Sequence, residues 1–456
     1  MKYLTPQKIA EATGGEYVGS ESTRNTRVDG AVRDNREVKP GNLFVCIQGA
    51  RVDGHDYANS AITAGAACCL AEHSIQDAKG PYVLVESTQA AIKSLAKYYR
   101  SLFSIPVIGI TGSVGKTTAK EMVAAVLRSR FDVLKTPENL NNELGVSLTL
   151  LSMSERHEAA VVEMGISEFG EMSRLADMVR PDICVMTRIG YAHLESLGDL
   201  NGVLRAKSEV FSFMKPDGAA ILNGDDELLR EFDPGIRKIT FGLNERSDIR
   251  AENIRADGTA SVSCDVVSGA GRFPIVIPAY GAHMVPAALT AVAAGRLLGL
   301  SDREMALGIR SYLPVGGRSN ISRTGFITLI DDCYNANPNS LRAALKSLAS
   351  LPGRHVAVLG DMLELGEASD ALHRELGVFA AQSGIDSLVC CGDKATHLFD
   401  GYLSAGGKGP RCFSEKDELI AALPELIKKD DAVLVKASHG MKFEEILPAL
   451  RELGRG

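Results

Sequence analysis

Several patterns that mark particular protein classes are absent from this sequence. Its nine cysteines include no C-x-x-C pair, and the pairs Cys68–Cys69 and Cys390–Cys391 lie in apolar runs. We interpret them as buried small hydrophobic residues rather than a disulfide or zinc framework. No run approaches the ~18 consecutive apolar residues of a membrane-spanning helix, and the first residues contain no apolar signal core. We therefore expect no membrane insertion and a cytoplasmic location, where thiols stay reduced.

An excess of basic charge is also lacking. The chain has 50 Lys and Arg against 57 Asp and Glu, a formal net charge of −7. Proteins that bind nucleic acids usually carry a basic excess, so we expect no nucleic-acid partner. Hydrophobic residues make up 45% and charged residues 23% of the 456 residues, which is typical of a globular protein. At roughly 150 residues per domain, this length predicts about three domains.

Strand-like apolar runs and helical patterns alternate in three blocks along the chain. Residues 1–105 mix short strands with helices and end before Pro106, which cannot continue a helix. In residues 106–314, Val/Ile-rich runs alternate with helical patterns, which predicts a parallel sheet covered on both faces. Residues 315–456 repeat the alternation and predict a Rossmann-like, doubly wound domain. The fold class is thus α/β with three domains.

A glycine-rich turn opens the second block, in the segment VIGITGSVGKTTAKEMVAAVLRSRF. Gly112 and Gly115 let backbone N–H groups turn toward phosphate oxygens at the start of a helix. Lys116 would reach the terminal phosphates, and the Thr117 hydroxyl would bind Mg²⁺. Ile110 stands where the strict pattern has its first glycine, but strand, turn, Lys-Thr and helix come in the right order. The nucleotide-binding residues predicted from this turn are Gly112, Ser113, Gly115, Lys116, Thr117 and Thr118.

An ATPase of this kind needs an acidic residue at the end of an apolar strand to hold Mg²⁺. Two runs qualify: AAVVEM, which reaches Glu163, and FITLIDD, which ends at Asp331-Asp332. Glu163 belongs to the same block as the glycine-rich turn, so it is the preferred metal carboxylate. No N-K-x-D motif is present, which argues against a GTP-binding switch.

Longer segments narrow the family. PENLNNELGVSLTLL (137–151), YAHLESLGDLNGVLRAKSEVF (191–211) and DDCYNANPNS (331–340), together with TGSVGKTT and VVEMG, resemble the Mur ligases of peptidoglycan precursor synthesis. RDNREVKPGNLFVCIQGARVDGHDY near the N-terminus resembles their UDP-sugar-binding domain. The resemblance spans essentially the whole chain. It implies a UDP-sugar-binding domain, a central P-loop ATPase domain and a C-terminal ligase domain.

The resemblance also implies a reaction and two metal ions. In this family ATP phosphorylates a peptide carboxylate, and an amine attacks the acyl phosphate to form an amide. The motifs are closest to the branch that joins D-alanyl-D-alanine to UDP-N-acetylmuramoyl-tripeptide, acting as a monomer. The family pattern places Thr117 and Glu163 at one Mg²⁺ and His193 and Lys207 at a second. Lys207 would act as a carbamate, because a cationic lysine cannot bind Mg²⁺. The catalytic residues implied are Lys116, Glu163, His193 and Lys207.

Further site residues follow from the same resemblance. Asn139 and Asn142 would line the carboxylate and phosphate region, and Arg318 and Asp332 would reach the nucleotide from the third domain. Arg36 is a candidate for the uridine and diphosphate. Residues expected to shape the dipeptide side are Tyr334, Asn335, Asn337, Lys436 and Ser438.

The chain departs from the family pattern at four notable positions. Met284 and Ala287 stand where the family usually has asparagines, the second of which hydrogen-bonds adenine. Arg188 replaces an asparagine and adds positive charge near the metal site. His439 replaces an arginine, so a fixed guanidinium becomes a titratable ring.

Two alternatives stay open. One is a related ATP-dependent ligase with another substrate, such as a folylpolyglutamate-type enzyme, although that branch lacks the UDP-sugar domain. The other is a non-catalytic nucleotide-binding homologue, which the replaced asparagines would favour.

Overall fold

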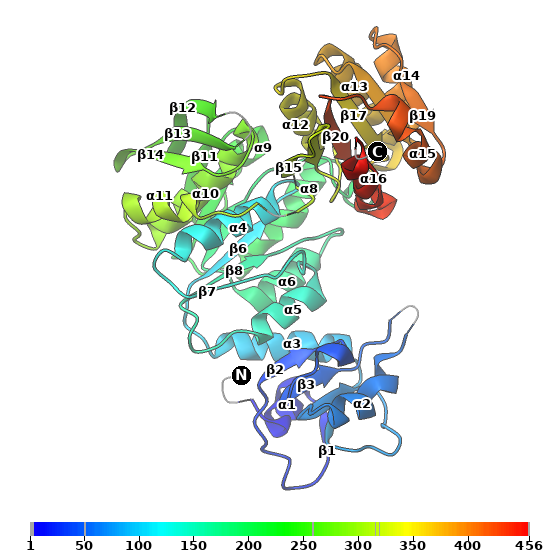
Figure 1. Cartoon of the computed structure of the whole chain (residues 1–456). Coiled ribbons are helices and arrows are strands. Elements are labelled where there is room, and N and C mark those ends of the chain that lie inside the picture. Colours follow the sequence, from blue (N-terminus) through cyan, green and yellow to red (C-terminus); the bar gives the residue numbers. More distant parts are fainter. Residues whose placement is uncertain (1–3, 50–51, 258–259, 315, 319, 455–456) are drawn as a thin grey trace.

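The chain forms three sheets in sequence order, each with its own helices (Figure 1). The computed structural model describes residues 4–49, 52–257, 260–314, 316–318 and 320–454. We call the parts before residue 106, from 106 to 314 and after 315 the N-terminal, central and C-terminal units. The N-terminal and C-terminal units lie at opposite ends of the central unit. The predicted three-domain α/β architecture is confirmed, while the domain boundaries stay a prediction.

The N-terminal unit is built on a five-stranded sheet of order β1-β5-β4-β3-β2, parallel except for β1. Its strands are β1 (Glu16–Val18), β2 (Gly30–Val32), β3 (Asn42–Val45), β4 (Cys68–Ala71) and β5 (Tyr82–Leu84). Its helices are α1 (Pro6–Thr13), α2 (Ala58–Thr63) and α3 (Thr88–Ser101).

Helix α3 joins the first two units into one hydrophobic core. It packs on α1 and also on helices α5 (Glu143–Leu151) and α6 (Glu171–Val179) of the central unit. The buried Tyr99 hydroxyl donates a hydrogen bond of 2.8 Å to the carbonyl of Met153. Apolar side chains from both units, from Leu4 to Leu229, form one continuous cluster. The chain boundary near Pro106 is therefore not a boundary of the core.

The central sheet has nine strands in the order β14-β13-β12-β11-β10-β9-β6-β8-β7. The seven strands from β6 to β12 pair in parallel. Strands β13 and β14 extend the sheet beyond β12 as an antiparallel meander. The strand bounds are β6 (Val107–Thr111), β7 (Val133–Lys135), β8 (Ala159–Glu163), β9 (Ile183–Met186), β10 (Ala219–Asn223), β11 (Arg237–Gly242), β12 (Ile249–Asp257), β13 (Ser261–Ser268) and β14 (Gly271–Ile277).

Helices cover both faces of this sheet, as the continuous apolar runs predict. On β8, Val161 packs in the cluster with α4 (Lys116–Leu127), α10 (Val285–Leu297) and α11 (Asp302–Arg310). Its neighbours Ala160 and Val162 point to the opposite face, into the cluster with α5 and α6. The remaining helices are α7 (Leu194–Leu197), α8 (Leu200–Ser208) and α9 (Glu227–Glu231).

The C-terminal unit is a doubly wound sheet of order β15-β16-β20-β17-β18-β19, parallel except for β15. Helices α12, α13 and α14 cover one face, and α15 and α16 cover the other. Its strands are β15 (Asn320–Arg323), β16 (Thr328–Asp331), β17 (His355–Gly360), β18 (Ser387–Cys391), β19 (Arg411–Phe413) and β20 (Ala432–Lys436). Its helices are α12 (Pro338–Ala349), α13 (Ser369–Gln382), α14 (Ala395–Ser404), α15 (Lys416–Leu426) and α16 (Leu447–Glu452). Among the residues that the structure describes, no helix is both long and apolar enough to span a bilayer.

Candidate active site

A cavity of about 510 Å³ lies where the carboxyl ends of the central parallel strands face the C-terminal unit. This is the edge of an open α/β sheet at which ligands usually bind. Most of the residues predicted from the sequence line it. They are Ser113, Gly115, Lys116, Thr117, Thr118, Asn142, Glu163, His193, Arg318, Asp332, Tyr334, Asn335, Asn337 and Lys436.

The glycine-rich turn joins β6 to α4 as predicted. Gly112 has φ 139°, and a Cβ there would lie 2.1 Å from the Thr187 Oγ1, so no side chain fits. Gly115 precedes α4 with φ 82°, a left-handed conformation that glycine adopts without strain. The Lys116 Nζ donates a hydrogen bond of 2.8 Å to the Gly112 carbonyl. The N–H groups at the start of α4 and the Lys116 ammonium together suit an anionic phosphate.

The loop after β9 packs directly against this turn. The Ser113 N–H donates to the Arg188 carbonyl at 2.7 Å, and the Ser113 hydroxyl donates to the Gly190 carbonyl at 3.0 Å. The Thr187 hydroxyl donates to the Val114 carbonyl at 2.6 Å. These bonds fix the loop that leads to His193 relative to the phosphate-binding turn.

Glu163 ends β8 with a carboxylate that is only 1% exposed. The Thr117 hydroxyl donates to one of its oxygens at 2.9 Å, and the Asn141 Nδ2 donates to the other at 2.8 Å. The Lys120 Nζ lies 3.6 Å away. A carboxylate and a hydroxyl in direct contact offer the oxygen ligands that Mg²⁺ prefers, so these residues fit the ion that the family pattern implies.

Lys207 on α8 is buried, with 1% exposure. Among the residues that the structure describes, none forms a hydrogen bond or ion pair with its Nζ. Burial, with the charge of Lys116 adding to it, holds the pKa of Lys207 well below its usual range. The neutral amine is therefore strongly favoured relative to a lysine in water.

His193 lies just before α7 with φ 53°, and its Nδ1 is 2.7 Å from the Glu364 carboxylate of the C-terminal unit. Burial lowers the pKa of His193, the Glu364 charge opposes that shift, and Lys207 lowers the pKa further. Burial thus disfavours the charged form of both His193 and Lys207, and a neutral imidazole has a lone pair that can bind a metal ion.

The C-terminal unit contributes a second charged group to the cavity. The Lys436 Nζ donates to the Asp332 carboxylate at 2.6 Å and to the Asn335 carbonyl at 2.8 Å. The Arg318 guanidinium lies 3.9 Å from the centre of the Tyr334 ring, and that ring lies 5.4 Å from the His439 ring. Stacking of this kind holds the planar guanidinium against the ring at the wall of the cavity.

Several predicted residues do not line the cavity. Asn139 is exposed, and Arg36 lies in the N-terminal unit, where its guanidinium pairs with Asp34 at 2.5 Å. The Ser438 hydroxyl accepts from the Leu363 N–H at 2.9 Å and so fixes a loop instead. Gly112 and Lys207 are also outside the lining, although both contact or influence residues that belong to it.

Sequence reasoning missed other residues of the site. Asn141 holds the Glu163 carboxylate, yet the two neighbouring asparagines of NLNNELG were preferred to it. Thr187 donates a hydrogen bond from its hydroxyl to the Val114 carbonyl of the glycine-rich turn. Its only signal in the sequence is its position directly after the apolar run ICVM. Of the four departures from the family pattern, Arg188, Met284 and Ala287 line the cavity and His439 does not.

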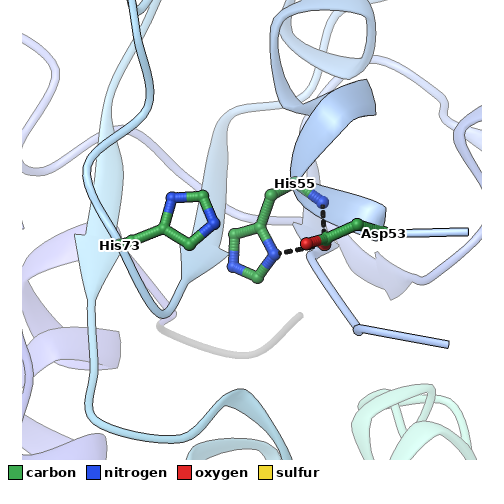
Figure 2. Close-up of side chains that lie close together, drawn as sticks. All are labelled: Asp53, His55 and His73. Atoms are coloured by element: carbon green, nitrogen blue, oxygen red, sulfur yellow. Dashed lines mark hydrogen bonds and ion pairs between the residues drawn. The ribbon is translucent and has the colours of Figure 1, made fainter.

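A separate group of titratable side chains lies in the N-terminal unit (Figure 2). The His55 Nδ1 is 2.6 Å from the Asp53 carboxylate, and the His55 Nε2 accepts from the Glu72 N–H at 2.9 Å. The His73 ring stacks on the His55 ring at 4.2 Å. Because both nitrogens of His55 are engaged, the ring has no lone pair left for a metal ion. These contacts fix the turn that begins the 3₁₀ helix Gly54–Tyr57.

Comparisons with known proteins agree with this geometry. Three family models match: "Mur ligase family, catalytic domain" over residues 28–100, "Mur ligase middle domain" over 110–295 and "Mur ligase, glutamate ligase domain" over 317–439. The UDP-N-acetylmuramoyl-tripeptide–D-alanyl-D-alanine ligase of Bacillus subtilis is 35% identical, with 98% of each chain covered.

Two solved structures are also similar over nearly the full length. The crystal structure of MurF from Acinetobacter baumannii has a TM-score of 0.89, 30% identity and 98% coverage of both chains. MurF ligase from Thermotoga maritima in complex with ADP has a TM-score of 0.82 and 29% identity, with 95% of this chain and 98% of that chain covered. This chain belongs to the Mur ligase family.

Proposed function

We propose that this protein uses ATP to join D-alanyl-D-alanine to UDP-N-acetylmuramoyl-tripeptide in peptidoglycan precursor synthesis. The observation that carries the proposal is one cavity that gathers the P-loop, the Glu163 carboxylate and His193 from the central unit with Lys436 and Arg318 from the C-terminal unit. The relative from Bacillus subtilis, matched along 98% of its length, is named for these two substrates. The cytoplasmic location expected from the sequence stays a prediction.

The proposed reaction has two steps. A carboxylate oxygen of the tripeptide attacks the γ-phosphorus of ATP, the bond to the bridging oxygen breaks, and ADP leaves. The amine of D-alanyl-D-alanine then attacks the acyl carbon, loses a proton, and expels inorganic phosphate as the amide forms. The first step brings two anions together, so charge neutralisation and alignment are the main demands on the protein. The Lys116 ammonium and the start of α4 meet that demand at the phosphates.

Thr117 and Glu163 are the residues that would hold one Mg²⁺, and His193 and Lys207 are those that would hold a second. When bound, the ions neutralise charge on the phosphates and the acyl oxygen. Asn141 keeps the Glu163 carboxylate oriented through its hydrogen bond of 2.8 Å. Asn142 lines the same wall, and Asn139 is the remaining candidate on that loop.

Lys207 would serve as a carbamate. Its neutral amine attacks the carbon of CO₂, an N–C bond forms, and a proton leaves, which converts the side chain into an anionic oxygen ligand. Two features of Lys207 support this step: burial favours the neutral amine, and no described residue competes for its Nζ. An unmodified ammonium would repel a cation at the same place.

The remaining residues are assigned by place. Tyr334, Asn335, Asn337 and Lys436 would shape the dipeptide side of the cavity, with Ser438 supporting the adjoining loop. Arg318 and Asp332 would approach the nucleotide from the C-terminal unit. Arg36 would bind the uridine diphosphate in the N-terminal unit, on the exposed turn Asn35–Glu37.

The test is a phosphate-release assay on the purified full chain with ATP, UDP-N-acetylmuramoyl-tripeptides and a panel of amines. We expect release that needs both the nucleotide-tripeptide and D-alanyl-D-alanine, with the amide product visible by mass spectrometry. Release with another acid or amine would favour the related-ligase alternative. Tight ATP binding without release on any pair would favour a non-catalytic homologue.

A further inference from the structure

One of the contacts between the central and C-terminal units joins two loops, each of which follows a parallel strand. One is the loop after β9, residues 187–193, and the other is the loop after β17, residues 361–366. At their contact, the Glu364 carboxylate lies 2.7 Å from the His193 Nδ1. This ion-pair contact joins the C-terminal unit to a residue already placed at the second metal position.

Both residues of this ion-pair contact have unusual backbone conformations. His193 has φ 53° and Glu364 has φ 63°, in the left-handed region that residues with a Cβ rarely occupy. Such a conformation is strained for a residue with a Cβ and persists only where surrounding contacts enforce it. The contact thus joins two residues that are each held in a strained backbone conformation.

The loop that carries Glu364 is held firmly on both sides. The Met362 N–H donates to the His373 Nε2 at 3.0 Å, and the Leu363 N–H donates to the Ser438 Oγ at 2.9 Å. The Leu365 side chain that follows is 3% exposed. The adjoining Gly366 is so close to the central unit that a Cβ would lie 3.4 Å from the Glu195 Cα. Glu364 therefore projects from a rigid loop that docks on the central unit.

The loop that carries His193 is held between the phosphate-binding turn and the C-terminal unit. The Gly190 N–H donates to the Ser113 Oγ at 3.0 Å. The next residue, Tyr191, donates its N–H to the Asn339 Oδ1 of α12 at 3.4 Å. The position of the C-terminal unit is thus transmitted to His193 through two contacts.

The place of the proton on a neutral His193 ring follows from the nearness of the carboxylate. A lone pair on Nδ1 would face an anionic oxygen 2.7 Å away, so the tautomer with the proton on Nδ1 and the lone pair on Nε2 is favoured. No hydrogen bond joins Nε2 to any residue that the structure describes. Histidines that bind metals commonly donate their other N–H to a carboxylate, which fixes the tautomer and the orientation of the ring.

We propose that Glu364 is a positioning residue that orients His193 for the second metal ion, so that this site is completed only when the C-terminal unit docks. The inference rests on the proposed function for the place of the metal ion. It adds a residue from a different unit of the chain and a link between domain docking and metal binding.

The experiment compares the wild-type full chain with Glu364→Gln, His193→Ala and the double variant. Glu367→Gln is the matched control, because Glu367 is an exposed carboxylate of the same segment with no hydrogen bond or ion pair to a described residue. Mn²⁺ binding is titrated by electron paramagnetic resonance in the presence of a non-hydrolysable ATP analogue. The Mg²⁺ dependence of phosphate release is measured in parallel.

We expect Glu364→Gln to weaken one of two Mn²⁺ sites by about 10-fold or more and to raise the Mg²⁺ concentration for half-maximal rate similarly. The double variant should be no weaker than His193→Ala, because Glu364 acts through that ring. Wild-type Mn²⁺ binding in Glu364→Gln, or additive losses in the double variant, would overturn the proposal. A fall in thermal stability with unchanged metal dependence would show a structural contact only and would overturn it too.

The two proposals fail separately. If Mn²⁺ binding shows the coupling while no amide forms with D-alanyl-D-alanine, the positioning role stands and the proposed substrates are wrong. If the amide forms and Glu364→Gln behaves as the wild type, the proposed function stands and Glu364 has no positioning role.

Discussion

A lysine side chain is normally a cation, but Lys207 lies where burial strongly disfavours the charged form. It is 1% exposed, and burial together with the Lys116 charge lowers the pKa of its amine. We expect Lys207→Ala to reduce phosphate release by more than about 100-fold, because a ligand of the reacting centre is lost. A small added carboxylic acid should restore part of the rate by replacing the carbamate oxygens, whereas excess bicarbonate should not.

The control is Lys215→Ala, which removes a lysine that is 72% exposed and pairs with Asp182. Its rate should match that of the wild type. Normal turnover in Lys207→Ala would contradict the carbamate proposal outright. Loss of turnover with no rescue by any carboxylic acid would leave Lys207 essential and remove the reason to call it a metal ligand.

His373 shows the opposite case, a titratable residue with a purely structural environment. It is fully buried, its Nε2 accepts from the Met362 N–H, and its Nδ1 is 2.7 Å from the Ser369 carbonyl. Burial lowers the pKa of His373 below 6.5, so below about pH 6.5 the unfolded chain binds a proton that the folded chain does not. Stability must then fall as pH falls through this window, by at most about 1.4 kcal/mol per pH unit for this one proton.

The measurement is the stability of the C-terminal unit in the full chain between pH 5.0 and 7.5. The chain is unfolded with urea, and hydrogen exchange reports the unfolding of this unit. His373→Gln keeps a polar side chain of similar size but does not titrate, so its slope with pH should be shallower than that of the wild type. Identical slopes would show that His373 is protonated in the folded chain as readily as in the unfolded one.

Helices and strands that are determined by their own residues could be predicted from the sequence. Strands that form only because they pair with another strand could not. The strand β6, its glycine turn and α4 follow one another within 21 residues, from Val107 to Leu127, so the sequence contains all the information for them. By contrast, β15 and β19 are short, exposed edge strands, and only pairing with β16 and β18 makes them strands. With four and three residues, they are too short for periodicity to reveal them.

The same distinction applies to the candidate site. Thr117 and Glu163 could be predicted because each follows a recognisable strand or turn, and they lie in contact as expected. The ion-pair contact between His193 and Glu364 joins residues that lie 171 positions apart in the sequence and belong to separate units. No local pattern reports a contact of that kind, because it depends on how two folded units dock.

Helix α12 provides a prediction at the scale of an element. Its N-cap Asn337 accepts from the Ser340 N–H at 2.9 Å, the Ser340 hydroxyl accepts from the Asn337 N–H at 3.1 Å, and Pro338 follows the cap. Asn337 was predicted as a dipeptide-side residue, and it also lines the cavity. We expect Asn337→Ala to destabilise the C-terminal unit by about 1 kcal/mol, measured by urea unfolding.

Asn337→Asp separates the two roles. Aspartate is as good an N-cap as asparagine, so the stability should be unchanged. A carboxylate has no N–H to offer a substrate and adds a negative charge to the cavity, so the KM for D-alanyl-D-alanine should rise. A KM equal to that of the wild type in this variant would limit Asn337 to its capping role.

At the scale of the whole molecule, α3 joins the N-terminal and central units by packing against helices of both. Besides the shared core, Lys93 of α3 lies 2.6 Å from Glu143 of α5, and Arg174 of α6 contacts the same carboxylate. Burial raises the pKa of Glu143, but the hydrogen bonds from Lys93 and Arg174 outweigh it and lower the pKa. The C-terminal unit, in contrast, has two hydrophobic clusters built almost entirely from its own residues, and among the described residues Tyr280 is the one buried residue of the central unit in them. Its other contacts with the central unit include the polar loop contacts of Glu364 and Asn339.

This arrangement predicts two cooperative unfolding transitions rather than three. Leu95 on α3 is fully buried in the cluster that both units share, and Leu95→Ala should cost about 2–5 kcal/mol through lost burial and the cavity left behind. Because the core is continuous, the loss should lower the transition of the N-terminal and central units together, as read by calorimetry and by hydrogen exchange on β4 and β8. Leu434→Ala, an equally buried change on β20, should lower only the other transition. If Leu95→Ala loosened β4 while β8 kept its protection, the two units would be unfolding independently, and α3 would be a linker rather than part of a common core.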